Sequence, residues 1–458
     1  MTDTSTAPTA GPEARSLLEA LDDRARGERA LSPDGETWLT VGDLLDRARG
    51  ERPPHRAPVA VSGEDPVAAA TGLLAAQERG CLPLVGTARL GRLDGAGRLL
   101  GRVRELAAGT HERLLVVVTS GTQGRPRAVV RTAASWDASL PGVDALLGED
   151  AGPGTVTWVP GAPSATLALF ALWHALSTGR PLVAPGRWRA GSAGTAGPGA
   201  GRNAEVVQGV PTVVADVLDA RAAGLLPRLR RAVVAGAVVT DGLRRRAAAV
   251  GVSLAEYYGA AELSFVAADT DGTGLRAFPG ARVQIRRGVI WVRSPYLSRG
   301  YLEPDPTGAL RRDAAGWASV GDLGDLGPDG VLRVTGRGDG TATVGGTTVG
   351  LGDVERALAD AEGVAELVAL AEPDGRLGER VVAVVRPVGT AEADRVVATL
   401  RDLARRGLPA AARPVRFVVR TELPRLPSGK VARADLLGEV LRDRAAPAAD
   451  PAGAGTRP

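Results

Sequence analysis

Short apolar runs alternate with longer segments in which alanine, leucine and arginine recur at helical spacing. An apolar run of a few residues is typical of a buried strand, and a longer periodic segment is typical of a helix. Strands that alternate with helices predict βα units and mostly parallel sheets. We expect such strand and helix pairs at 59–62 and 66–77, at 155–159 and 165–176, and at 232–235 and 241–250, with a further strand at 114–119.

The pattern changes after Gly280, where short β segments are separated by glycine, aspartate and proline. The segments 283–285, 289–292 and 331–335 predict a smaller β-rich subdomain. The glycine-rich stretch 336–340 is interpreted as a linker to a further unit.

The last part of the chain has a pattern of its own, which predicts a small α+β domain. Its expected elements are a helix at 354–361, strands at 366–371 and 381–385, a helix at 391–405 and a strand at 416–419. The predicted fold class is therefore α/β, with a large N-terminal domain of mostly parallel sheets and helices plus a β-rich subdomain, and a small C-terminal α+β domain. The predicted limits are 15–338 and 339–443, with disordered ends at 1–14 and 444–458.

The composition is ordinary for a globular protein, with 44% hydrophobic and 24% charged residues. Residues 1–15 lack the basic and apolar regions of a signal peptide, and the most apolar stretch, 166–176, is too short to span a bilayer. We therefore expect a cytoplasmic protein with no integral membrane segment.

Charge and residue usage exclude several classes of function. The net charge is +4, but the basic residues are spread along the chain among 52 acids, and aromatic residues make up only 3%. A nucleic-acid-binding protein would be expected to cluster its positive charge and to offer aromatic rings for stacking. Cys81 is the only cysteine and there are three histidines, which argues against disulfides, thiolate metal clusters and histidine-rich metal sites.

A loop rich in glycine and hydroxyl residues follows the strand expected at 114–119. Glycines let backbone N–H groups converge on an anion, while hydroxyl and guanidinium groups add donors and charge. The loop lacks the lysine of a P-loop, and a turn without function could have the same composition. The candidate phosphate-binding residues are Thr119, Ser120, Gly121, Thr122, Gln123, Gly124 and Arg127.

A second signal is the run from Tyr257 to Glu262. The ring of Tyr258 could stack on a purine, and the carboxylate of Glu262 could supply an oxygen ligand to Mg²⁺. A core tyrosine and a solvated glutamate are the alternative reading of the same residues.

A third signal is Asp322 in a glycine-bounded turn, followed by Arg337 and Asp339. An acidic residue in such a turn can accept hydrogen bonds from ribose hydroxyls, although Asp-Gly turns without function are also common.

The fourth signal is a loop of prolines and glycine at 424–431, which presents Lys430. Lys430 is the only lysine, and all the other basic residues among the 56 are arginines. A lysine kept in such a chain suggests a position that needs a compact ammonium group on a flexible stem.

Taken in order, the four motifs resemble those of the adenylate-forming superfamily, which includes acyl- and aryl-CoA synthetases, adenylation domains of peptide synthetases, and luciferases. Among these groups, the chain most resembles an acyl-CoA synthetase. The counterparts of the four family motifs lie at 119–127, 258–262, 321–339 and 424–430, and the resemblance spans roughly 58–437.

The resemblance implies that a carboxylic acid is activated with ATP to an acyl-adenylate and then passed to the thiol of CoA. In the family, Lys430 would bridge the carboxylate and the α-phosphate, Glu262 would be catalytic and ligate Mg²⁺, and Asp339 would be the hinge of a mobile C-terminal domain. The residues that would hold the nucleotide besides the phosphate loop are Tyr258, Gly259, Ala260, Asp322 and Arg337. The residues that would line the acyl pocket are Trp158, Ala162, Ala235, Gly236, Ala237 and Tyr257.

The motifs depart from the family pattern where Ala261 and Gln123 replace threonines and Arg127 replaces lysine, and the usual P-x-x-H of the substrate-side motif is absent from 159–163. Small residues near the expected pocket favour a fatty acid of medium or long chain. Two alternatives remain open: a stand-alone adenylation enzyme that loads the pantetheine of a carrier protein, and a degenerate homologue that only binds nucleotide.

Overall fold

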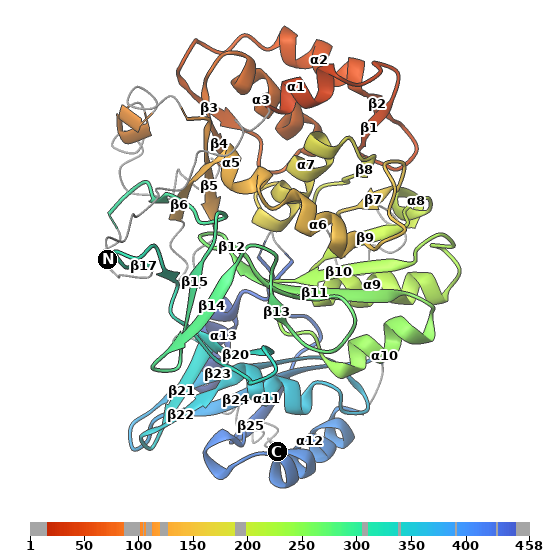
Figure 1. Cartoon of the computed structure of the whole chain (residues 1–458). Helices are drawn as coiled ribbons and strands as arrows, with labels where there is room; N and C mark the ends of the chain where they lie inside the picture. The colour runs from red at the N-terminus through yellow and green to blue at the C-terminus, as the bar shows by residue number, and fades with distance from the viewer. Residues whose placement is uncertain are drawn as a thin grey trace, which may run out of the picture. The chain divides into compact units, whose positions relative to one another are not determined.

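The computed structural model describes residues 16–86, 101–103, 105–106, 112–119, 127–187, 198–304, 310–337, 340–389, 392–426 and 429–445. The chain divides into two compact units, the first comprising Met1–Val334 with Pro427–Lys430 and the second Thr335–Leu426 with Val431–Pro458 (Figure 1). The domain limits expected from the sequence stay a prediction, and the two expected disordered ends lie outside the described residues except for 444 and 445.

The largest sheet of the first unit has nine strands in the order β13-β12-β11-β10-β9-β7-β8-β1-β2. Its central strands are parallel, and antiparallel strands complete both edges. The strands are β1 (Arg29–Ser32), β2 (Leu39–Thr40), β7 (Thr157–Trp158), β8 (Leu182–Val183), β9 (Val206–Gly209), β10 (Arg231–Ala235), β11 (Ser253–Ala260), β12 (Ser264–Asp269) and β13 (Arg276–Ala277).

Apolar side chains project from both faces of the nine-stranded sheet, and each face packs into its own hydrophobic core. Helices therefore cover both faces. One core includes side chains of α6 and α7, and the other includes side chains of α9 and α10. The helices of the first unit are α1 (Leu17–Asp22), α2 (Val41–Gly50), α3 (Pro66–Glu78), α5 (Ala133–Asp137), α6 (Leu140–Leu147), α7 (Thr166–Thr178), α8 (Pro198–Gly201), α9 (Pro211–Ala222) and α10 (Asp241–Ala249).

A second sheet carries the loop singled out as phosphate-binding. Its order is β16-β6-β5-β4-β3, with parallel pairing from β3 to β5 and antiparallel pairing from β5 to β16. The strands are β3 (Pro58–Val61), β4 (Leu82–Val85), β5 (Leu114–Thr119), β6 (Arg127–Thr132) and β16 (Gly300–Tyr301).

The expected β-rich subdomain is a third sheet, in the order β17-β18-β15-β19-β20 with β14 paired to β15. Arg337 ends β20, so the first part of the expected linker at 336–340 belongs to a strand, which corrects that interpretation. The strands are β14 (Arg282–Arg286), β15 (Val289–Arg293), β17 (Arg311–Arg312), β18 (Ala318–Ser319), β19 (Asp322–Leu326) and β20 (Leu332–Arg337).

The second unit has a five-stranded sheet in the order β22-β21-β24-β23, with β25 paired to β24. The α/β fold class with a C-terminal α+β domain is confirmed, and none of the helices within the described ranges is long and apolar enough to cross a membrane. The elements of this unit are β21 (Thr341–Val344), β22 (Thr347–Gly350), α11 (Leu351–Leu358), β23 (Val364–Asp374), β24 (Gly378–Pro387), α12 (Ala393–Gly407), η4 (Ala410–Ala412), β25 (Arg416–Val419) and α13 (Arg433–Ala445).

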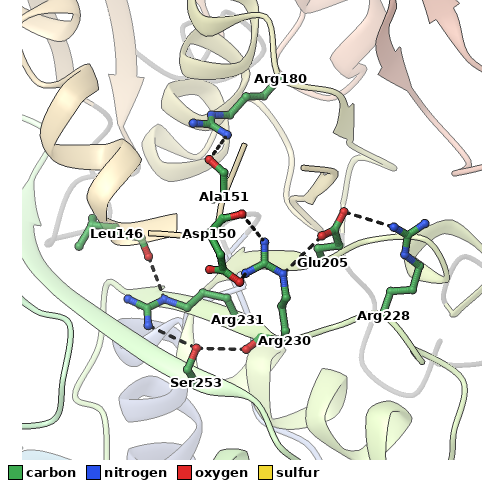
Figure 2. Close-up of polar contacts among 9 residues, drawn as sticks. All are labelled: Leu146, Asp150, Ala151, Arg180, Glu205, Arg228, Arg230, Arg231 and Ser253. Atoms are coloured by element: carbon green, nitrogen blue, oxygen red, sulfur yellow. Dashed lines mark hydrogen bonds and ion pairs between the residues drawn. The ribbon is translucent and has the colours of Figure 1, made fainter. Parts of the chain in front are cut away.

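A network of arginines closes the amino ends of β9, β10 and β11 (Figure 2). Arg230 pairs with Asp150 and with Glu205, while Arg231 donates from Nε to the Leu146 carbonyl at 3.0 Å. These contacts tie the chain after α6 to the start of the sheet. Because acceptors on the protein itself use these guanidinium groups, the amino ends are a structural edge, and the candidate chemistry lies at the carboxyl ends.

Candidate functional site

The two ends of the candidate phosphate loop meet in one strand pair. Thr119 ends β5 and lies opposite Arg127, the first residue of β6. The Thr119 hydroxyl donates to the Arg127 carbonyl at 3.3 Å, which holds the two ends together. The intervening candidates, Ser120, Gly121, Thr122, Gln123 and Gly124, lie outside the described residues.

Glu262 lies in the tight turn that joins β11 to β12. The backbone comes so close there that a Cβ at Gly259 would be 2.1 Å from the Ser264 carbonyl oxygen, so only glycine fits. The pairing of β11 with β12 shifts register between Tyr258 and Gly259, and Leu263 N–H donates to the Ala260 carbonyl at 3.1 Å. This geometry turns Glu262 out of the strand, yet its residue surface is only 9% exposed.

Tyr301 joins Glu262 to the phosphate loop. Its hydroxyl donates to Glu262 Oε1 at 2.6 Å and accepts from Arg127 Nη1 at 3.0 Å. The Arg127 guanidinium also lies 5.1 Å from the centre of the Tyr301 ring, within the range of a cation–π contact. Burial and the neighbouring Glu262 raise the pKa of Tyr301, so the hydroxyl remains a donor at neutral pH. Tyr301 could not be picked out from the sequence, because a lone aromatic in a short β segment has no distinguishing spacing.

The buried Arg131 holds the main chain of the Glu262 turn. Its residue surface is 1% exposed, and its guanidinium donates to the carbonyls of Ala261, at 2.5 Å, and of Tyr296. The side chain also lies over the Trp136 ring at 5.7 Å. Burial lowers the pKa of Arg131 to about 9, although the nearby Glu262 opposes this change, so the group stays charged at neutral pH. Arg131 could not be picked out from the sequence either, since its acceptors are carbonyls distant in the chain.

Tyr258 and Asp322 form the second pair of predicted residues that the structure brings together. The Tyr258 hydroxyl donates to Asp322 Oδ2 at 2.6 Å. Asp322 is 8% exposed and begins β19 directly after Gly321, which corrects its predicted place in a turn. The side chain of Arg337 and the whole of Asp339 lie outside the described part of the chain.

Lys430 is exposed and belongs to the first compact unit. Its side chain lies beside Gly236, just after the end of β10: a Cβ built at Gly236 would be 2.6 Å from Lys430 Cε. Gly236 has a φ of +87°, which favours glycine there independently of the lysine. The predicted catalytic ammonium group and the carboxyl end of the sheet are therefore neighbours.

Of the six predicted pocket residues, Ala235 lies opposite Tyr257 in the parallel pair of β10 and β11, and their shared role as an acyl pocket stays a prediction. Trp158 is 1% exposed and belongs to the core on the α9 side of the nine-stranded sheet. Tyr257 packs on the opposite side, with its ring centre 4.7 Å from that of Phe265. Burial raises the pKa of Tyr257, which keeps its phenol neutral. Ala162 and Ala235 are buried, whereas Gly236 and Ala237 are exposed.

Comparison with known proteins agrees with this geometry. Residues 101–302 match the family described as AMP-binding enzyme, and residues 353–430 match the AMP-binding enzyme C-terminal domain. A probable 2-succinylbenzoate–CoA ligase of Mycobacterium tuberculosis is 31% identical over 353 residues, which cover 74% of this chain and 88% of that protein. FadD10 of the same species, a medium/long-chain-fatty-acid–[acyl-carrier-protein] ligase, is 28% identical over 386 residues, which cover 74% of this chain and 68% of that protein.

Solved structures show the same fold. The anthranilate CoA ligase AuaEII in complex with anthranoyl-AMP superposes with a TM-score of 0.77 at 16% identity, covering 95% of this chain and 99% of that one. A variant of Escherichia coli MenE gives a TM-score of 0.74 at 20% identity, covering 95% of this chain and 100% of that one.

Proposed function

Because the chain belongs to the adenylate-forming family of AMP-binding enzymes, we propose that it activates a carboxylic acid with ATP and transfers the acyl group to the thiol of coenzyme A. This makes it an AMP-forming acid–thiol ligase. The observations that carry the proposal are two sets of contacts between candidate motifs: Tyr301 joins Arg127 of the phosphate loop to Glu262, and Tyr258 donates to Asp322.

The first half-reaction transfers the adenylyl group of ATP to the acid. A carboxylate oxygen of the acid attacks the α-phosphorus of ATP, the bond to the oxygen bridging to the β-phosphate breaks, and pyrophosphate leaves. Catalysis of such a step depends mainly on positioning and on neutralising charge. Lys430 would place its ammonium group between the carboxylate and the α-phosphate, and Arg127 would offer its charge to the departing phosphates.

The second half-reaction passes the acyl group to sulfur. The thiolate attacks the acyl carbonyl carbon, the bond from that carbon to the AMP oxygen breaks, and AMP leaves. Asp322 would hold the ribose hydroxyls through both steps, with the Tyr258 ring against the adenine. The hinge role of Asp339 stays a prediction.

The residues present suit a magnesium ion that arrives with ATP. Among the described residues, no three His, Cys, Asp or Glu side chains gather into a metal-binding group. Mg²⁺ bound to a nucleotide needs only one or two protein carboxylates, because phosphate oxygens and water complete its octahedron. Glu262 offers such a carboxylate, with Oε1 accepting from Tyr301. The ion, when bound, would neutralise phosphate charge.

The nature of the acid and of the acceptor thiol is a finer proposal. We propose a fatty acid as the substrate class and CoA as the acceptor, with the pantetheine of a carrier protein as the alternative acceptor. The second acceptor is favoured by FadD10 and by MmaC of Mycobacterium marinum, named a fatty acid–[acyl-carrier-protein] ligase and 28% identical over 377 residues. A cytoplasmic location stays a prediction.

Acid-dependent exchange of labelled pyrophosphate into ATP tests the activity. A panel of fatty, aryl and dicarboxylic acids should give exchange with at least one class, and that acid should then consume CoA with release of AMP. Acylation of a carrier protein with no reaction on CoA would assign the alternative acceptor. Binding of ATP without exchange on any acid would overturn the proposed function in favour of a nucleotide-binding homologue without catalysis.

A further inference from the structure

The segment 298–301 contacts Glu262 at both its main chain and its side chain. The Ser298 N–H donates to the Glu262 carbonyl at 2.8 Å, which fixes the main chain of the turn. Three residues later, the Tyr301 hydroxyl donates to Glu262 Oε1 at 2.6 Å. One short segment therefore positions both the backbone and the carboxylate of this glutamate.

Tyr301 itself is held by the strand that carries Arg127. It lies opposite Val129 in the antiparallel pair of β16 and β6, and Leu302 N–H donates to the Ala128 carbonyl at 2.8 Å. Arg127 is two residues from Val129, so its side chain is the diagonal neighbour of Tyr301 on the same face. The 3.0 Å contact of Arg127 Nη1 with the hydroxyl follows from this register.

We propose that Tyr301 is a positioning residue for the magnesium-binding end of the site. Its hydroxyl orients the Glu262 carboxylate toward the metal of Mg·ATP and ties that carboxylate to Arg127. This inference rests on the proposed function, in which Glu262 holds the ion that enters with ATP.

The chemistry of the three groups explains why a hydroxyl is needed. The carboxylate can only accept and the guanidinium can only donate, whereas a phenol donates to one and accepts from the other. A donor to Oε1 leaves the second carboxylate oxygen for a metal. Groups that hydrogen-bond a metal ligand orient it and strengthen its binding, and losing one typically lowers metal affinity by 10- to 100-fold.

Tyr301→Phe is the test, because it removes the hydroxyl and keeps the ring that stacks with Arg127. Tyr296→Phe is the matched control: its hydroxyl donates to the Pro279 carbonyl, away from Glu262. Calorimetry on the full chain would titrate α,β-methylene-ATP at increasing Mg²⁺, and AMP without Mg²⁺. Transfer of the acyl group from supplied acyl-adenylate to the thiol would be measured in parallel, since that half-reaction has no departing pyrophosphate.

In Tyr301→Phe, we expect the Kd of the magnesium complex to rise at least about 10-fold while AMP binding and acyl transfer stay unchanged. Tyr296→Phe should match the parent protein in all three measurements. Unaltered binding of the magnesium complex by Tyr301→Phe would overturn the proposal, and so would an equal loss of AMP binding, which would indicate a structural role alone. Absence of pyrophosphate exchange in the parent protein would count against the proposed function. The binding measurements would still decide whether Tyr301 positions Glu262 for the magnesium complex.

Discussion

The turn that carries Glu262 and the loop that carries Lys430 are fixed by different kinds of contact. Glu262 is held by a neutral hydroxyl, and its turn is held by a buried arginine that donates to a main-chain carbonyl. The loop base, in the second unit, is held by arginine–carboxylate pairs: Arg425 with Glu366 at 2.6 Å and Arg433 with Glu355 at 2.6 Å.

The difference follows from what each group has to do. A carboxylate already paired with a guanidinium has fewer lone pairs and less charge to offer a metal, so a neutral donor suits Glu262 better. The lysine loop has no such restriction at its base, where Arg425 and Val431 form a β-bridge and Ala432 N–H donates to the Pro424 carbonyl at 2.8 Å. Strong pairs can therefore close the base of this loop.

The largest expected effect is that of Lys430→Gln, which removes the positive charge of the loop and leaves the pairs at its base in place. We expect adenylation, measured by pyrophosphate exchange, to fall by about 10²- to 10³-fold, the usual cost of losing one positioned donor to developing charge. Transfer from supplied acyl-adenylate should persist. Equal exchange rates in the variant and the parent would remove Lys430 from the mechanism.

Arg131→Met tests how the turn that carries Glu262 is held. It leaves the carbonyls of Ala261 and Tyr296 without their buried donor, and we expect the free energy of unfolding in urea to fall by about 2 kcal/mol. Arg246→Met is the control, because Arg246 also donates to a carbonyl, that of Ala215, but its side chain is 45% exposed. A loss no greater than that of the control would show that Arg131 does not hold the Glu262 turn.

Glu366→Gln weakens the base of the lysine loop without changing Lys430 itself. The Glu366 side chain is 8% exposed and accepts from Arg425, with Arg386 at 3.5 Å, so the pair is well shielded. We expect pyrophosphate exchange to fall by about 10-fold as the lysine becomes less well placed, with transfer from supplied acyl-adenylate retained. Asp402→Asn, which breaks the exposed pair of Asp402 with Arg405, should change neither rate. Equal losses in both half-reactions would indicate general destabilisation.

The sequence predicted the residues that occur in ordered motifs and missed those that act across the fold. Glu262, Tyr258, Asp322 and Arg127 could be named because they fall in short motifs whose order along the chain resembles that of a known family. Tyr301 could not, since its partners lie 39 and 174 positions away in the chain and only the pairing of β16 with β6 brings them near.

Strand register also decides which core each of the predicted pocket residues packs into. Trp158 and Tyr257 were named from the family resemblance, and their side chains pack into the two cores on opposite faces of one sheet, while the pocket itself stays a prediction. A shift of one residue along a strand exchanges its two faces, and apolar runs buried on both sides carry no alternation to reveal which is which. The strands themselves were predictable, because a strand buried on both faces is a continuous apolar run in the sequence.

Tyr258→Phe should have the smallest effect of the series. It removes the hydroxyl that donates to Asp322 Oδ2 at 2.6 Å and keeps the ring for stacking on adenine. A single hydrogen bond to a charged acceptor contributes about 1.5–3 kcal/mol at most. Here the loss is partly offset, because Asp322 becomes freer to accept from ribose. We therefore expect AMP affinity to change by only about 3-fold, and Tyr258→Ala, which also removes the ring, to lower it by about a further 10-fold. If the two variants bound AMP equally well, the ring would have no part in holding the base, and the nucleotide would have to be placed by the Glu262 side of the site alone.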